Sequence, residues 1–197
     1  MPAASRQITS HDIVPDDAFR AARKARRAAL LPVKALRRVA LGPWCTVHFE
    51  CFETMLFQVQ EMLLIEKGGP AQLADELAAY NPLIPQGREL VATVMFEIDD
   101  PVRRAAILAG LGGVEDRFYL ALGESRAIGR PEGDVERTRD DGKTSSVHFL
   151  RFALTDPQVT AFRDEQVRAT IGCDHPAYVH LAALSAPTRG ELSRDLA

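Results

Sequence analysis

The chain of 197 residues lacks the features that mark secreted and membrane proteins. It has only three cysteines, Cys45, Cys51 and Cys173, an odd number with no Cys-x-x-Cys pair, which disfavours a disulfide scaffold. No apolar run approaches the roughly 20 residues that span a bilayer. The first residues also lack the apolar core of a signal peptide. These absences predict a cytoplasmic protein with reduced thiols and no membrane span.

Motifs for common chemistries are missing as well. The sequence has no G-x-G-x-x-G loop after a strand, no Walker phosphate loop, no G-x-S-x-G elbow and no H-E-x-x-H helix. Its net charge of −3 and its 26% of charged residues exclude a generally basic nucleic-acid coat and an ordinary disordered chain. No residue pattern specifies a reaction, so it stays open whether the protein is an enzyme.

Composition and periodicity predict a single α+β domain over residues 1–197. Hydrophobic residues make up 46% of the chain, and no repeat or linker divides it. Apolar residues recur at helical spacing over residues 50–66 and at every second residue over 90–98, and the segment 146–154 is largely apolar on both of its faces. Because strands follow helices and some are joined by hairpins, we expect a mainly antiparallel sheet of about four to six strands packed with helices.

Two local signals predict element boundaries. Pro32 is expected to end a first helix at about Leu31, because proline cannot donate the helical hydrogen bond. Asp141-Gly142 is typical of a tight hairpin that leads into the strand over 146–154.

The basic residues are concentrated near the N-terminus. No acidic residue lies between Asp17 and Glu50, although that stretch holds eight basic residues. Four of them follow helical spacing and share one face, here called the basic face: Arg20, Arg23, Lys24 and Arg27. This face is either a solvated surface that offsets the acidic remainder, or a docking surface for an acidic partner or a phosphate-bearing ligand. The interleaved aromatic residues of a nucleic-acid surface are missing.

Carboxylates form a stripe along the predicted helix over 50–66. Glu50, Glu53 and Glu61 fall within roughly 120° of one another on a helix that is otherwise apolar. Buried carboxylates need compensation by an arginine, a metal or water. The stripe is therefore a solvent-exposed edge, a network of carboxylates paired with arginine, or a metal site. In the third case His148 completes the site, and the metal is iron, manganese or zinc.

A second grouping involves His48. If residues 46–50 are extended, His48 and Glu50 share a face, and with His148 they would form the two-histidine, one-carboxylate set of non-haem iron sites. Such a pair arises often by chance. His148 itself shares a strand face with Leu150 and Phe152, and a lone histidine on an apolar face is usually a hydrogen-bonded core residue.

Several strings together resemble an uncharacterised bacterial family, domain-of-unknown-function family 3501. The strings are Arg38-Val39-Ala40-Leu41-Gly42-Pro43, Phe49-Glu50, Glu53-Thr54, Gln58-Val59-Gln60-Glu61-Met62, Ala79-Tyr80-Asn81-Pro82-Leu83-Ile84-Pro85, Ser146-Val147-His148-Phe149-Leu150-Arg151-Phe152 and Asp174-His175-Pro176. The resemblance spans nearly the whole chain and implies no activity. It does imply a context, because genes of this family tend to lie beside those for rubrerythrin and an iron–sulfur oxidoreductase.

The family pattern includes glutamates that match Glu50, Glu53 and Glu61 and a histidine that matches His148. It does not require a histidine at His48. The leading hypothesis is an uncharacterised cytosolic accessory protein of a bacterial redox or peroxide-defence system that acts through protein contacts, with the basic face as its docking surface. The alternative is a small metalloenzyme with its site between the 50–66 helix and the 146–154 strand. A module that binds an anionic ligand is a third, weaker hypothesis.

Overall fold

The computed structural model describes residues 6–132 and 144–196. Its helices are α1 (Asp16–Leu36), α2 (Phe52–Glu66), α3 (Gly69–Tyr80), α4 (Pro101–Ala109), α5 (Asp156–Arg163) and α6 (Ala186–Leu192). Its strands are β1 (Arg38–Leu41), β2 (Cys45–Phe49), β3 (Glu89–Phe96), β4 (Phe118–Leu122), β5 (Ser125–Pro131), β6 (Val147–Ala153), β7 (Ala169–His175) and β8 (Tyr178–Ala183). Short 3-10 turns are η1 (Ser10–Asp12), η2 (Asn81–Leu83) and η3 (Val114–Arg117). The predicted Asp141-Gly142 hairpin lies outside the described residues.

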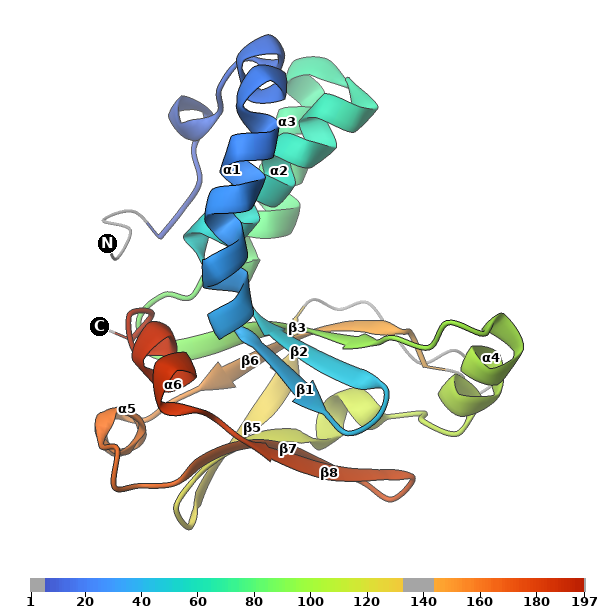
Figure 1. Ribbon diagram of the computed structural model, residues 1–197, viewed down its shortest axis with the longest axis vertical. Coiled ribbons are helices and arrows are strands. Elements are labelled where there is room, and N and C mark those ends of the chain that lie inside the picture. Colours follow the sequence, from blue (N-terminus) through green and yellow to red (C-terminus); the bar gives the residue numbers. More distant parts are fainter. Residues whose placement is uncertain (1–5, 133–143, 197) are drawn as a thin grey trace.

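The strands form one antiparallel sheet in the order β1-β2-β3-β6-β5-β4-β7-β8. The sheet curls until its two edges approach each other in a nearly closed barrel (Figure 1). Tyr178, the first residue of β8, joins these edges. Its hydroxyl donates to the carbonyl of Leu41 over 2.7 Å and accepts the backbone N–H groups of Trp44 and Cys45.

The predicted number of strands is wrong. The α+β class is right, but the sheet has eight strands instead of four to six. The missed edge strand, β8, carries a weak periodic signal, because an edge strand of a curled sheet covers little of the core. In β8 only Tyr178 is buried. Edge pairing, which local periodicity does not report, adds this segment to the sheet.

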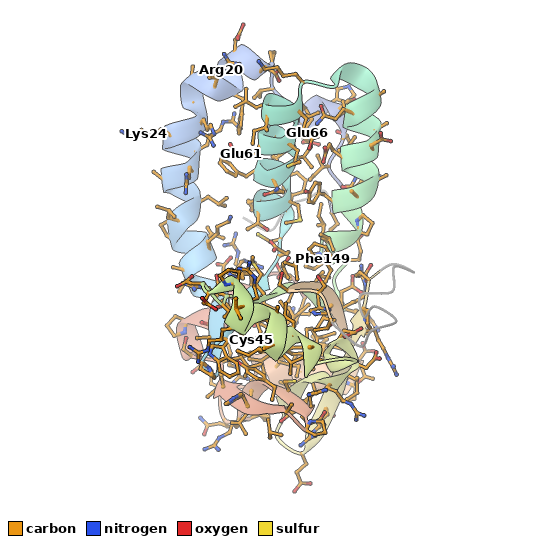
Figure 2. All side chains as sticks on the ribbon, turned by 90° about the vertical axis from the view of Figure 1, so that its right-hand side faces the viewer. Arg20, Lys24, Cys45, Glu61, Glu66 and Phe149 are labelled. Atoms are coloured by element: carbon orange, nitrogen blue, oxygen red, sulfur yellow. The ribbon has the colours of Figure 1, made fainter. Side chains whose placement is uncertain are left out.

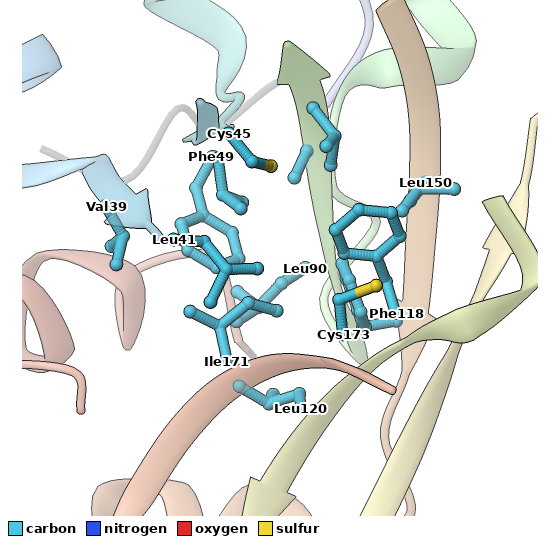
Figure 3. Packing of buried hydrophobic residues seen from close by; sticks show 14 of the residues in the cluster. Val39, Leu41, Cys45, Phe49, Leu90, Phe118, Leu120, Leu150, Ile171 and Cys173 are labelled. Carbon is cyan, nitrogen blue, oxygen red and sulfur yellow. The ribbon is translucent and has the colours of Figure 1, made fainter. Parts of the chain in front are cut away.

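The main core fills the inside of the curled sheet (Figure 3). Every strand contributes inward-facing residues to it, including Val39, Leu41, Phe49, Leu90, Leu120, Leu150 and Ile171. A smaller cluster lies on the outer face of the sheet under α2 and α3 and contains Ile8, Met55, Val59, Leu63, Leu83, Ile84 and Val91. Helices α1, α2 and α3 therefore stand on the outer face as a projecting layer (Figure 1).

Helix α1 runs five residues beyond its predicted end. Pro32 lies inside the helix, which continues to Leu36. A proline in a helix removes one backbone hydrogen bond. The next residue after the helix, Arg37, is buried and ion-paired, so tertiary contacts hold the last turn in place despite that loss.

Strand β6 confirms the strand predicted over 146–154. It lies between β3 and β5 in the sheet. His148, Leu150 and Phe152 are buried and face the main core, whereas Phe149 packs against the cluster under α2 and α3. The alternation places His148 on the face of the sheet opposite to α2.

Candidate functional site

The predicted carboxylate stripe separates into three environments. Glu50 precedes α2, and its two oxygens accept the hydroxyls of Thr54 and Thr93, each over 2.7 Å. Glu53 is exposed. Glu61 accepts two hydrogen bonds from Arg23, over 2.7 Å from Nε and 2.6 Å from Nη2. The hydrogen bonds from Arg23 lower the pKa of Glu61. One member of the basic face is thus engaged within the molecule.

His148 is a hydrogen-bonded core residue. Its side chain is fully buried, and its Nε2 lies 2.9 Å from the Ser145 carbonyl and 3.3 Å from Thr144 Oγ1. The imidazole also meets the Phe96 ring edge to face. These contacts orient the ring toward the main core and away from α2.

The four residues of the metal hypothesis do not converge. Glu50, Glu53 and Glu61 lie on the outer side of the sheet, and His148 lies on the inner side. Within residues 6–132 and 144–196, no group of three or more His, Cys, Asp or Glu side chains is arranged to hold a metal ion. A metal bound by all four residues is a hypothesis that would require the sheet to rearrange.

A cavity of about 310 Å³ lies between the outer face of the sheet and the bases of α1, α2 and α3. Its polar lining residues are Lys34, Arg37, His48, Glu50, Thr54, Gln58, Tyr80 and Thr93. Its apolar lining residues include Met55, Leu83, Met95, Val147 and Phe149. The predicted shared face of His48 and Glu50 therefore exists, and it borders this cavity without His148.

His48 lies half-buried at the polar end of the cavity. Burial lowers the pKa of its imidazole, against the opposing influence of Glu50 and Glu97. Its Nε2 is buried and has no hydrogen-bond partner in the described part of the chain. A buried polar atom left without a partner costs roughly 1–3 kcal/mol, so His48 has an unmet hydrogen-bonding capacity beside the cavity.

Arg37 anchors the wall of the cavity. The residue is 3% exposed, and its guanidinium binds Asp195 through two hydrogen bonds of 2.7 and 2.9 Å and reaches Glu191 over 3.1 Å. A fourth hydrogen bond goes to the backbone carbonyl of Glu50. Burial lowers the pKa of Arg37, but the hydrogen bond and the charge of Asp195 outweigh it and raise the pKa.

The basic face lies on the projecting helical layer. Arg20, Lys24 and Arg27 are exposed, and none of them forms an ion pair with a described residue. Figure 2 shows Lys24 on the side of α1 away from α2, with Glu61 between the two helices. Beside this face, α1 and α2 enclose an apolar groove of about 270 Å³, lined by Phe19, Arg26, Ala29, Leu30, Val33, Glu53, Leu56, Phe57 and Gln60.

The three cysteines are free and buried. Cys45 and Cys173 lie in the main core (Figure 3), and Cys51 is the N-cap residue of α2. Burial raises the pKa of all three thiols, to about 11 for Cys51 and Cys173 and higher for Cys45. None of the helices in the described part of the chain is long and apolar enough to cross a membrane.

The predicted family is confirmed. The model of the family described as "Protein of unknown function (DUF3501)" matches residues 7–196, and the chain belongs to this family. The fold is similar to the crystal structure of a novel protein of unknown function from Burkholderia pseudomallei K96243. That structure has 34% sequence identity and a TM-score of 0.89, and the match covers 97% of this chain and 100% of the other. No curated protein matches the chain.

Sequence reasoning missed most of the residues that build the site. Arg37, Asp195 and Thr93 had no signal in local spacing, because their partners lie 43 to 158 positions away. The one available signal was the H-x-E spacing of His48 and Glu50, which does place both side chains at the cavity.

Proposed function

We propose that this member of the family is a cytoplasmic accessory protein that binds an acidic partner protein through the basic face, within a bacterial redox or peroxide-defence system. The observation that supports this proposal is the exposure of Arg20, Lys24 and Arg27 without an ion pair among the described residues. Cations on one helix face attract an acidic surface and speed its encounter.

The packing of α1 supports the same proposal. Only two of its 21 residues, Phe19 and Leu30, are buried, and Leu31 is 58% exposed. Helices in proteins are stabilised mainly by the packing of an apolar face. With only two buried residues, α1 contributes little to the core. The adjoining apolar groove could receive apolar side chains of the partner, while the basic face meets its carboxylates.

The partner is an acidic protein of a redox system, and the family resemblance suggests two candidates, rubrerythrin and the iron–sulfur oxidoreductase. The free cysteines suit a reducing cytoplasm, in which such systems work. Electrostatic docking of this kind is sensitive to salt, because exposed charges are screened over a Debye length.

The test is direct binding of each purified candidate to the full chain, measured by biolayer interferometry at low and high salt. The variant reverses Arg20, Lys24 and Arg27 to glutamate and leaves Arg23, which pairs with Glu61, unchanged. The matched control reverses three exposed arginines of the barrel, which gives the same change in net charge: Arg117, Arg130 and Arg168.

We expect one candidate to bind, and the helix variant to weaken that binding by about ten-fold or more. The barrel control should weaken it much less. Equal loss in the two variants would show a general charge effect and contradict a specific face. Failure of both candidates to bind the native protein at low salt, or binding of free phosphate to the basic face in their place, would refute the proposal.

A further inference from the structure

The cavity between the sheet and the helical layer combines a fixed carboxylate with an apolar wall. It is separate from the outward-facing cations of α1. Phe149 marks its place at the base of the helical layer (Figure 2). Its volume of about 310 Å³ lies in the range of small-ligand sites, roughly 300–1,000 Å³.

Glu50 is held in place before any ligand arrives. Thr54 and Thr93 each donate a hydroxyl to a different oxygen of the carboxylate. A carboxylate has about four acceptor positions, so two remain for additional donors. Because α2 and β3 supply the two threonines, the carboxylate is oriented by rigid elements, which lowers the entropic cost of binding.

The cavity presents this carboxylate as its uncompensated charge. Arg37 also lines the cavity, but Asp195 and Glu191 already bind its guanidinium. Lys34 is exposed and forms no ion pair with Glu50, although its charge reaches His48 and contributes to the lowered pKa of that imidazole. No ion pair to Glu50 is found in the described part of the chain. The polar end therefore favours a ligand that carries a positive charge and N–H donors.

The remaining lining favours an apolar body. It includes Met55, Leu83, Met95, Val147 and Phe149. Thioethers adapt to irregular shapes, and an aromatic ring attracts a nearby cation. His48, whose buried Nε2 has no partner among the described residues, adds one further polar group at the charged end.

We propose that this cavity binds a small apolar amine, with its ammonium group hydrogen-bonded to Glu50 and its aromatic or branched body against the methionine and phenylalanine wall. The binding is reversible and involves no covalent step. The site is independent of the docking function assigned to the basic face, which lies on the outward side of α1.

The test uses phenethylamine as the probe, with hydrocinnamate and phenethyl alcohol as anionic and neutral compounds of similar size. Isothermal titration calorimetry and the melting temperature are measured on the full chain. Glu50→Gln removes the charge and keeps the size, and Val147→Phe fills the cavity from β6. Glu53→Gln is the matched control, because this substitution removes the same charge from a residue that does not line the cavity.

We expect phenethylamine to bind and to raise the melting temperature, and hydrocinnamate to do neither. Glu50→Gln and Val147→Phe should each weaken binding by about ten-fold or more, whereas Glu53→Gln should bind like the native protein. Equal binding of the amine and the acid, unchanged binding by both cavity variants, or no binding of the amine at millimolar concentration would overturn the proposal. If Glu50→Gln fails to fold, Val147→Phe decides the outcome alone.

Discussion

Arg37 and Asp195, which lie 158 positions apart in the sequence, form a buried bidentate ion pair. Arg37 follows α1 directly, and Asp195 lies just beyond α6, so the pair joins the projecting helical layer to the C-terminal segment. Glu191 approaches the same guanidinium. One arginine thereby fixes the base of α1, the wall of the cavity and the end of the chain.

Replacement of Asp195 should therefore destabilise the whole fold. We expect Asp195→Asn to lower the free energy of unfolding by about 3 kcal/mol, because it leaves a buried guanidinium with only part of its compensation. Urea unfolding followed by circular dichroism measures the change. The control is Arg88→Gln, which breaks the exposed pair with Asp156 and should cost less than about 1 kcal/mol. Similar losses in the two variants would contradict the role assigned to Arg37.

The sequence predicted those parts of the fold that depend on local periodicity. The strand over 146–154 and the helix over 50–66 were found because their apolar residues recur along one segment. Strand β8 and the closure of the sheet were missed, because they depend on contacts such as that of Tyr178 with Leu41, 137 positions apart. Pro32 misled the prediction of the end of α1, since anchoring at Arg37 prevails over the local preference of proline.

The candidate site was less predictable than the fold. Helical spacing predicts that Glu50, Glu53 and Glu61 form one stripe. Glu50, however, lies before the N-cap of α2, directly after β2, so the helical spacing does not apply to it. Alternation along β6 then determines that His148 faces the main core. Which face of a sheet a helix covers is a tertiary property, so the sequence could not show that these side chains lie on opposite sides.

Gly42, in the turn between β1 and β2, should tolerate no side chain. Its φ of +73° favours glycine, and a Cβ there would lie 2.6 Å from the imidazole of His180 on β8. We expect Gly42→Ala to destabilise the protein by at least about 1–2 kcal/mol, from backbone strain and displacement of His180. Gly110→Ala is the control. A Cβ at Gly110 would lie 3.5 Å from its nearest neighbouring atom, and the φ of Gly110 is negative, so neither a clash nor backbone strain is expected. Thermal unfolding that leaves both variants equal to the native protein would contradict the tight closure of the sheet.

The three thiols should be unreactive in the folded protein. The pKa of about 11 for Cys51 and Cys173 leaves about one thiolate in a thousand at pH 8, and Cys45 is shifted further. We expect the thiol reagent DTNB to label none of them rapidly at pH 8, and to label all three in guanidinium chloride. Rapid labelling of one thiol in the native state would identify an accessible, activated cysteine and contradict the buried environment.

The ion pair of Glu61 with Arg23 should make stability depend on pH in the acidic range. Arg23 lowers the pKa of Glu61 below its ordinary value of 4.5 in the folded state. The pair therefore stabilises the protein above that value, and its contribution disappears as the pH falls through the lowered pKa. Glu61→Gln should melt below the native protein at pH 7, and the difference should shrink as the pH falls below about 4. Glu165→Gln, an exposed carboxylate without an ion pair to a described residue, should show no such convergence.

Glu53 provides the sharpest test of the metal hypothesis. Its side chain is exposed and forms no ion pair with a described residue, so Glu53→Gln should change the free energy of unfolding by less than about 0.5 kcal/mol. A bound metal would stabilise the folded state by an amount that rises with the logarithm of its concentration above the dissociation constant, and loss of a ligand would remove that effect. We expect iron, manganese and zinc to leave the melting temperatures of the native protein and of Glu53→Gln equally unaffected. A rise in the native melting temperature that Glu53→Gln abolishes would show that Glu53 is a metal ligand and would contradict this expectation.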